Sequence, residues 1–139
     1  MVEILLSAEN LSKHFQISKG VILKKVLAEV QAVDNVFFKI IKGQTMGLVG
    51  ESGSGKTTLG KLAVRLLDPT SGKIIFRGKD ITQLNREELR EIRSKMGVIF
   101  QDPFSSLDPR KSISQIVGEP MRIHGTGDGE QRTKRICEL

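Results

Sequence analysis

Two stretches in the first half of the chain alternate between apolar and polar positions. The residues from Ile4 to Phe15 alternate nearly throughout, and those from Ala32 to Ile41 end in large apolar side chains. A period of two is typical of a strand with one buried face, so both stretches predict strands. The residues between them, 16–31, stay ambiguous, because the apolar run 21–27 suits either an edge strand or an irregular excursion.

Continuous apolar runs at 46–49 and 97–100 predict two short buried strands. The first run leads into a segment, 57–67, that predicts a helix. Proline and glycine within 68–72 interrupt regular structure after that helix. The residues 73–77 then predict a further strand, so strands and helices are mixed along the chain.

The second half of the chain begins with a helix signal. Asn85 is a plausible N-cap for a helix over 86–95, with two glutamates in its first turn where negative charge is favoured. Leu89 and Ile92 would form its inward face. The residues 102–110, which include two prolines, predict a loop.

Two more helical segments are expected before the end of the chain. Ser112 is expected to cap a helix that stops near 118–120, where glycine and proline occur. A glycine-rich link at 125–129 follows it. The residues 130–139 then predict the start of another helix.

The most specific motif follows the first buried run. Residues 50–57, G-E-S-G-S-G-K-T, match the P-loop pattern G-x-x-x-x-G-K-S/T between a predicted strand and a predicted helix. Its glycines allow the backbone to turn N–H groups towards phosphate oxygens, and Lys56 can reach the outer phosphates. Thr57 offers a hydroxyl to Mg²⁺, above a helix N-terminus with partial positive charge. The order of elements favours a nucleotide site over a chance glycine-rich turn.

Composition excludes several classes of protein. The 139 residues are 38% hydrophobic and 27% charged, which is typical of one globular domain. No apolar run approaches the roughly 20 residues that span a bilayer, and the N-terminus lacks the pattern of a secretion signal, so we expect a cytoplasmic location. The formal charge of +6 is scattered, and its densest stretch, 132–135, has no interleaved aromatic residues, so nucleic acid is not an expected partner. Cys137 is the only cysteine, which excludes an internal disulfide.

Two further segments resemble the ATP-binding domains of ABC transporters. The residues Pro69 to Ile74 (P-T-S-G-K-I) are similar to that family's turn and strand after the P-loop helix, and Val98 to Gln101 (V-I-F-Q) is similar to its Q-loop. Within the family, the run Phe100 to Arg110 (F-Q-D-P-F-S-S-L-D-P-R) resembles the oligopeptide and dipeptide importers. Thr58 to Lys61 resembles the second of their paired ATPase subunits. The likeness extends to about His124.

The resemblance implies an α/β fold with a P-loop NTPase core of the ABC type and an N-terminal antiparallel β subdomain, incomplete at the C-terminus. It implies that residues 1–124 belong to the ATP-binding domain and that 125–139 begin a helical subdomain. The implied ligands are ATP and Mg²⁺. The implied partners are a second ABC ATPase subunit, in a dimer, and membrane-spanning permease subunits that contact the loop after Gln101, which would place the assembled protein on the inner face of the cell membrane.

The resemblance also assigns residue roles. Phe15 would stack on adenine, although a core phenylalanine at a strand end explains it equally well. Gln101 would approach Mg²⁺ or its water, the alternative being an ordinary polar residue at a strand end. Lys56 and Gln101 are the candidate catalytic residues, and Thr57 and Gln101 the candidate metal ligands. The expected nucleotide contacts are Phe15, Gly50, Glu51, Ser52, Gly53, Ser54, Gly55, Lys56, Thr57 and Thr58.

The sequence departs from the family in what hydrolysis needs. It contains no L-S-G-G-Q signature and no apolar strand ending in Asp-Glu, and neither His14 nor His124 occupies the switch position. We therefore expect an ATPase driving peptide import in the parent subunit, and nucleotide binding without turnover in these 139 residues alone. Two alternatives stay open: a non-transport ABC ATPase of the DNA-repair or translation type, and a noncatalytic remnant or interaction module.

Overall fold

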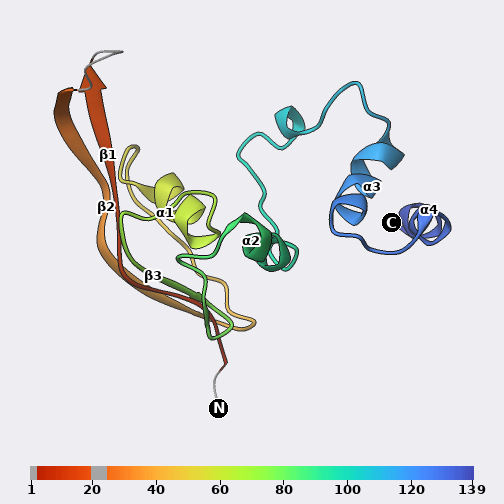
Figure 1. Cartoon of the computed structure of the whole chain (residues 1–139), viewed down its shortest axis with the longest axis horizontal. Coiled ribbons are helices and arrows are strands. Elements are labelled where there is room, and N and C mark those ends of the chain that lie inside the picture. Colours follow the sequence, from red (N-terminus) through yellow and green to blue (C-terminus); the bar gives the residue numbers. More distant parts are fainter. Residues whose placement is uncertain (1–2, 20–24) are drawn as a thin grey trace. The chain divides into compact units, whose positions relative to one another are not determined.

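The computed structural model describes residues 3–19 and 25–139, and the chain divides into two compact units, 1–85 and 86–139. The first unit is built on an antiparallel sheet with strand order β2-β1-β3-β4 (Figure 1). Its strands are β1 (Ile4–Lys19), β2 (Lys25–Ile41), β3 (Ser71–Phe76) and β4 (Lys79–Asp80). The predicted strands at 4–15, 32–41 and 73–77 are confirmed, and β1 and β2 are longer than expected. Part of the ambiguous run 21–27 lies outside the described residues.

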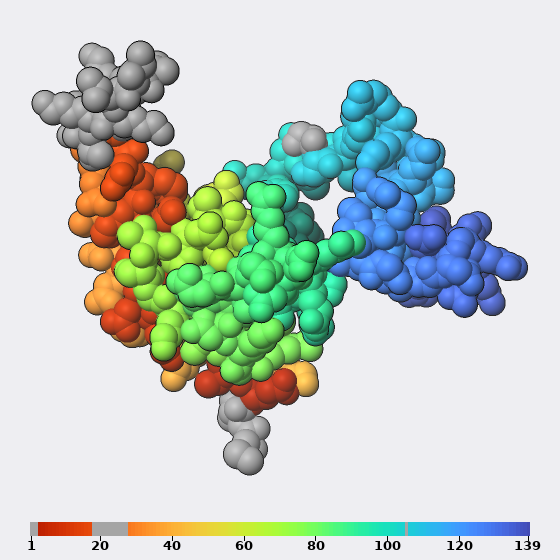
Figure 2. All heavy atoms as spheres, in the orientation of Figure 1, coloured from red at the N-terminus to blue at the C-terminus, as the bar shows by residue number. Residues whose placement is uncertain are grey.

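The helix α1 (Lys56–Ala63) contacts the long strands β1 and β2 (Figure 1). Leu62 on α1, Leu11 on β1 and Ile74 on β3 are fully buried, as is Ile81 after β4. Burying large aliphatic side chains of this kind stabilises the fold by about 1.5–3 kcal/mol each. The core of this unit therefore lies between the sheet and α1. The loop 50–55 leads into this packed helix. In Figure 2 the yellow-green spheres of α1 lie beside the red and orange spheres of β1 and β2.

Two asparagines mark irregular positions in the β1–β2 pair. Asn10 and Asn35 have positive φ angles of 49° and 48°, each beside a register shift between the strands. The Asn10 side chain donates to the Asn35 side-chain oxygen at 3.1 Å, and the Asn35 backbone N–H donates to Ser12 Oγ at 2.8 Å. Asparagine tolerates this left-handed region better than most residues. These bulges bend the long strands where β3 joins the sheet.

The two runs predicted as buried strands, 46–49 and 97–100, are not strands. Both are irregular, and Val49 and Ile99 are 91% and 90% exposed. A strand forms only where its N–H and C=O groups pair with a neighbour, and within the described residues neither run pairs with a strand. An apolar composition alone therefore does not make these segments regular.

The second unit contains only helices and loops among its described residues. They are α2 (Arg86–Arg93), the 3₁₀ turn η1 (Phe104–Ser106), α3 (Ile113–Ile123) and α4 (Gly129–Glu138). Leu89 and Ile92 are buried as predicted, whereas the capping role of Asn85 stays a prediction. In the described part of the chain, no helix has the length and apolar character required to cross a bilayer.

Helix α3 begins as predicted and ends later than predicted. Ser112 forms a capping box with Gln115: the Gln115 N–H donates to Ser112 Oγ at 3.3 Å, and the Ser112 N–H donates to Gln115 Oε1 at 2.8 Å. The predicted stop near 118–120 is wrong, because the helix continues through Pro120 to Ile123. A β-carbon on Gly118 would lie 2.8 Å from Ile136 Cδ1, so α3 packs closely on α4 at this point.

Candidate phosphate-binding site

The loop 50–55 leads directly into α1. Gly50, Gly53 and Gly55 have φ angles of 155°, 82° and 86°, a region that favours glycine. Gly55 is the N-cap of α1, and the first helical hydrogen bond runs from the Leu59 N–H to the Gly55 carbonyl at 2.8 Å. The glycine spacing of the motif is therefore required by the backbone conformation it adopts.

Gly55 lies directly against β2. A β-carbon there would stand 2.1 Å from the carbonyl oxygen of Ala32. Ala32 lies at a register shift, because Lys13 pairs with Val33 and His14, the next residue on β1, pairs with Gln31. An extra residue of this kind forms a β-bulge, and bulges often re-aim the chain beside functional sites. The bulge brings the Ala32 carbonyl against the loop and seats the loop on the sheet.

The side chain of Lys56 folds back into the loop. Its ammonium group donates to the carbonyl of Gly50 at 2.8 Å, to that of Glu51, and to Ser54 Oγ at 3.3 Å. An ammonium group has three donors, so these three acceptors engage all of them. A phosphate that reaches this loop must take over at least one of these contacts. The loop thus surrounds the Lys56 ammonium, which is the positive charge that would bind an anion.

The start of α1 is left open to an anion. Its N-cap, Gly55, provides no side-chain acceptor, and the first turn contains no carboxylate. In contrast, α3 and α4 each have a capping box, made by Ser112 and Asp128 with the glutamine three residues later. The first four N–H groups of a helix have no acceptor within it and together favour negative charge. The amides of 56–58 are therefore available to a bound phosphate.

A hollow of about 280 Å³ lies beside the loop. From the loop and α1 it is lined by four residues of the motif, together with Leu59 and two residues that precede the loop. From β2 it is lined by residues that no motif marked, because only the tertiary fold brings β2 to the loop. The lining residues are Leu48, Val49, Gly50, Ser54, Gly55, Lys56 and Leu59 on the loop side, and Ala32, Val33, Asp34 and Val36 on β2. Two glycines of the motif, Gly50 and Gly55, are among these lining residues.

Phe15 lies on β1 and is not a core residue. It is 39% exposed and pairs across the strands with Val30, which is two residues from the Ala32 that contacts the loop. The ammonium of Lys13 stands over its ring, 5.3 Å from the centroid. This exposure argues against the core alternative, although Phe15 is not among the residues that line the hollow.

Three further predicted site residues, Thr57, Thr58 and Gln101, are not among those that line the hollow. Thr57 is exposed and Thr58 half-buried, and both belong to the first turn of α1. Gln101 is exposed and belongs to the unit 86–139, whereas the P-loop belongs to the unit 1–85. Its approach to a metal ion stays a prediction.

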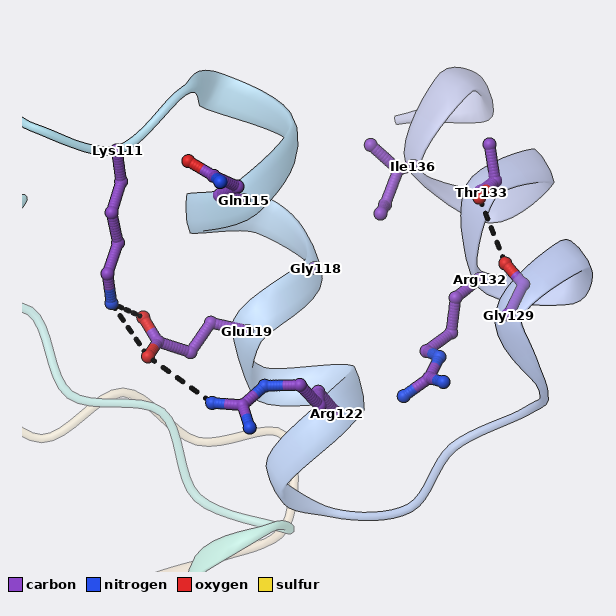
Figure 3. A pocket seen from close by; sticks show the side chains of 9 residues that line it. All are labelled: Lys111, Gln115, Gly118, Glu119, Arg122, Gly129, Arg132, Thr133 and Ile136. Carbon is purple, nitrogen blue, oxygen red and sulfur yellow. Dashed lines mark hydrogen bonds and ion pairs between the residues drawn. The ribbon is translucent and has the colours of Figure 1, made fainter.

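A second hollow, of about 460 Å³, lies between α3 and α4 (Figure 3). The Glu119 carboxylate accepts hydrogen bonds from Lys111 Nζ at 2.8 and 2.6 Å, and Arg122 stands 3.9 Å from it. Figure 3 shows Arg122 and Arg132 at one end of the hollow and Ile136 at the other. None of the predicted nucleotide contacts lines it, so it has no part in the phosphate site.

The family model for ABC transporters matches residues 33–138. The chain belongs to this family. The match begins on β2 and includes the P-loop, the segment 69–74 and Gln101, so it covers the motifs on which the resemblance was based.

The curated ABC relatives include several proteins named as importers. The chain is 43% identical over 138 residues to an oligopeptide transport ATP-binding protein, AppF, of Bacillus subtilis, covering 99% of this chain and 42% of the relative. It is 45% identical over 131 residues to a putative peptide import ATP-binding protein of Brucella ovis, covering 94% and 39%. A glutathione import ATP-binding protein, GsiA, of Salmonella paratyphi A is 42% identical, with coverage of 99% and 22%. The chain spans less than half the length of these relatives.

Solved ABC structures confirm the fold class. The dimeric ATP-binding cassette MJ0796, in a post-hydrolysis state bound to ADP and phosphate, has a TM-score of 0.79 at 28% identity, covering 96% of this chain and 54% of that one. The cassette cbiO1 of Clostridium perfringens has a TM-score of 0.73 at 24% identity, covering 98% and 49%, and supports the fold alone. The predicted α/β fold of the ABC type, with its antiparallel β sheet, is confirmed.

Proposed function

We propose that this chain is the nucleotide-binding part of an ATPase subunit that drives the import of oligopeptides or dipeptides. The observation that supports nucleotide binding is the loop closed around Lys56 at the uncapped start of α1. The names of the relatives, oligopeptide transport and peptide import ATP-binding proteins, support the importer class. The likeness of Thr58 to Lys61 to the second of two paired subunits points to a partner ATPase of the same family.

In this proposal the loop, α1 and two residues outside them contact different parts of the nucleotide. The amides of 56–58 donate to phosphate oxygens, and Lys56 exchanges its hydrogen bond to the Gly50 carbonyl for one to an outer phosphate oxygen. Thr58 contacts an inner phosphate. The exposed ring of Phe15 stacks on adenine, and Gln101 senses the state of the nucleotide.

The residues of the loop also fit a magnesium ion that arrives with ATP. The described residues contain no cluster of three or more histidine, cysteine, aspartate or glutamate side chains that could hold a metal alone. Magnesium takes few protein ligands beside substrate phosphates, and in P-loop proteins one of them is the serine or threonine after the lysine, a role that suits the exposed Thr57. When bound, the ion neutralises charge that develops on the phosphates during transfer. Gln101 would supply a second oxygen.

Binding should be tested with one variant and one matched control. Removing the ammonium in Lys56→Ala should lower the affinities for ATP and inorganic tripolyphosphate by about 10- to 100-fold, since a charge-assisted hydrogen bond contributes about 1.5–3 kcal/mol. Lys61→Ala removes an exposed lysine from the other end of the same helix and should change either affinity by less than about twofold. Titration calorimetry measures both. Equal losses in the two variants would contradict a phosphate site at Lys56.

We propose further that these 139 residues alone hydrolyse ATP negligibly, since they contain neither the signature nor the Asp-Glu strand of the family. Phosphate release at the rate of a complete ABC ATPase, abolished by Lys56→Ala, would overturn that statement.

The permease contact is proposed for the loop after Gln101. Phe104, in η1, is 83% exposed and has the apolar ring expected of a docking residue. A photo-crosslinker at Phe104 in the assembled importer should label a membrane-spanning subunit, which would place the protein at the inner face of the membrane. Labelling of a DNA-repair or translation partner instead would favour a non-transport ABC ATPase.

A further inference from the structure

The ammonium group of Lys13 lies between two parts of the first unit. It stands 5.3 Å from the centroid of the Phe15 ring, and the same atom donates to the backbone carbonyl of Asp68 at 2.7 Å. Lys13 and Phe15 are two residues apart on β1, so their side chains leave the same face of the strand. A cation within about 6 Å of a ring centroid is attracted to the ring face. One face of Phe15 therefore carries a charge that the chain itself holds in place.

The anchor of Lys13 is joined to the phosphate-binding helix. Asp68 forms an ion pair with Arg65, which follows the C-cap of α1. The Arg65 side chain is only 5% exposed, and its Nε donates to the carbonyl of Ile81 at 3.0 Å. Burial and this hydrogen bond fix the guanidinium, and the guanidinium restrains Asp68. The Lys13 ammonium is thus held by residues that follow the C-terminal end of α1. The P-loop leads into the N-terminal end of the same helix.

The Phe15 ring stays accessible in spite of this contact. It is 39% exposed, and its cross-strand partner Val30 is 46% exposed, so an apolar surface lies open beside the ring. A cation on one face of an aromatic ring draws the π electrons towards itself. The opposite face then becomes a better partner for an electron-rich aromatic system.

We propose that Lys13 is a positioning residue for the nucleotide base: it holds the Phe15 ring from one face so that the other face receives the purine of a nucleoside triphosphate. The proposal rests on the stacking role given to Phe15 in the proposed function. Lys13 touches the ring and not the nucleotide. It acts on base affinity alone, because its contacts do not include the loop that binds phosphate.

The test compares a ligand that has a base with one that lacks it. Lys13→Met keeps an unbranched apolar side chain of similar length and removes the charge. It should lower the affinity for ATP by about two- to fivefold, the range expected of an exposed cation–π contact. The affinity for inorganic tripolyphosphate should change by less than about 1.5-fold. Lys13→Arg restores the cation and should retain the ATP affinity. Lys39→Met removes an exposed charge from the same strand pair, far along it from Phe15, and should change neither affinity.

A double variant distinguishes positioning from a structural role. In a Phe15→Ala background, Lys13→Met should cause no further loss of ATP affinity, because the ring through which it acts is absent. Equal weakening of ATP and tripolyphosphate, or an unchanged ATP affinity in Lys13→Met, would overturn the proposal. A loss of ATP affinity in Phe15→Ala together with no effect of Lys13→Met would overturn only the role of Lys13. The loss of both ligands in Lys56→Ala reports on the proposed function independently.

Discussion

The carbonyl oxygen of Ala32 occupies the space in which Gly55 would carry a side chain. A β-carbon at Gly55 would lie 2.1 Å from that oxygen, well inside the distance that two such atoms tolerate. The φ angle of 86° at Gly55 also lies in the region that favours glycine. Two independent constraints, one local and one from β2, therefore require a glycine at the start of α1.

Gly55→Ala should consequently disrupt both the fold and the phosphate site. The strained backbone alone is expected to cost about 1–3 kcal/mol of unfolding free energy, and the contact with Ala32 forces the loop away from β2. We expect ATP and tripolyphosphate affinities to fall at least about tenfold, since the amides of the loop lose their alignment. Urea unfolding measures the first effect and titration calorimetry the second.

Gly60→Ala is the matched control for this prediction. Gly60 lies within the same helix, its φ is not positive, and a β-carbon there would meet nothing within 4 Å. Alanine is favoured over glycine in a helix by about 1 kcal/mol, so this variant should be as stable as the parent or more so, with unchanged affinity. Equal damage from the two variants would show that the contact with Ala32 is not the cause.

The sequence predicted the loop well because its requirements are local. Positive φ angles at Gly50, Gly53 and Gly55 follow from the motif itself, and so does the position of Lys56. The contribution of β2 could not be predicted, because Ala32 and Asp34 reach the loop only through a bulge in the pairing with β1. No local pattern identifies which residue of a long strand will be the extra one.

The predicted strands at 46–49 and 97–100 were wrong for a related reason. Their apolar residues match a buried strand, but a strand requires a partner, and Val49 and Ile99 are instead exposed. The predicted end of α3 was also wrong: the helix continues through Pro120, and Gly118 is where α3 packs closely on Ile136 of α4. By contrast, the cap at Ser112 depends on residues within one turn and was predicted correctly.

Thr82 is expected to contribute to the stability of β3 through its hydroxyl group. Its Oγ1 accepts a hydrogen bond from the N–H of Ile74 at 2.8 Å, and both residues are buried. Thr82→Val keeps the shape and leaves that N–H without its acceptor, which should cost about 1–3 kcal/mol of unfolding free energy. Thr82→Ser retains the hydroxyl and should lose less. Urea unfolding measures both, and equal stability of the valine and serine variants would contradict the role of the hydrogen bond.

Asp80 should make the stability of this region depend on pH. The hydroxyl of Thr82 lowers the pKa of Asp80 most, followed by the Thr82 backbone N–H, while Lys73 adds a smaller effect and partial burial opposes them. A pKa that is lower in the folded than in the unfolded state stabilises the fold above the unfolded value of 3.8, and that stabilisation is lost as pH falls through the folded value.

Two measurements check the direction of the Asp80 pKa shift and of the pH dependence that follows from it. Asp80→Asn should reduce the pH dependence of the urea midpoint below about pH 4, where the unfolded carboxyl binds a proton before the folded one. In Thr82→Val, NMR titration should show the Asp80 carboxyl moving towards its ordinary pKa, because the largest cause of the shift is removed. An unchanged Asp80 titration in that variant would show that the hydroxyl is not the cause.

The capping box of α3 should set how readily that helix opens from its N-terminus. Ser112→Ala removes the acceptor for the Gln115 N–H and should cost about 1 kcal/mol, which raises amide hydrogen exchange in the first turn of α3 about fivefold. Gln115→Ala breaks the reciprocal bond, and the double variant should lose less than the sum of the two because both residues belong to one box. Ser112→Thr keeps a hydroxyl acceptor and serves as the control. Faster exchange in α3 for Ser112→Thr and Ser112→Ala alike would mean that side-chain packing, and not the cap, holds the first turn.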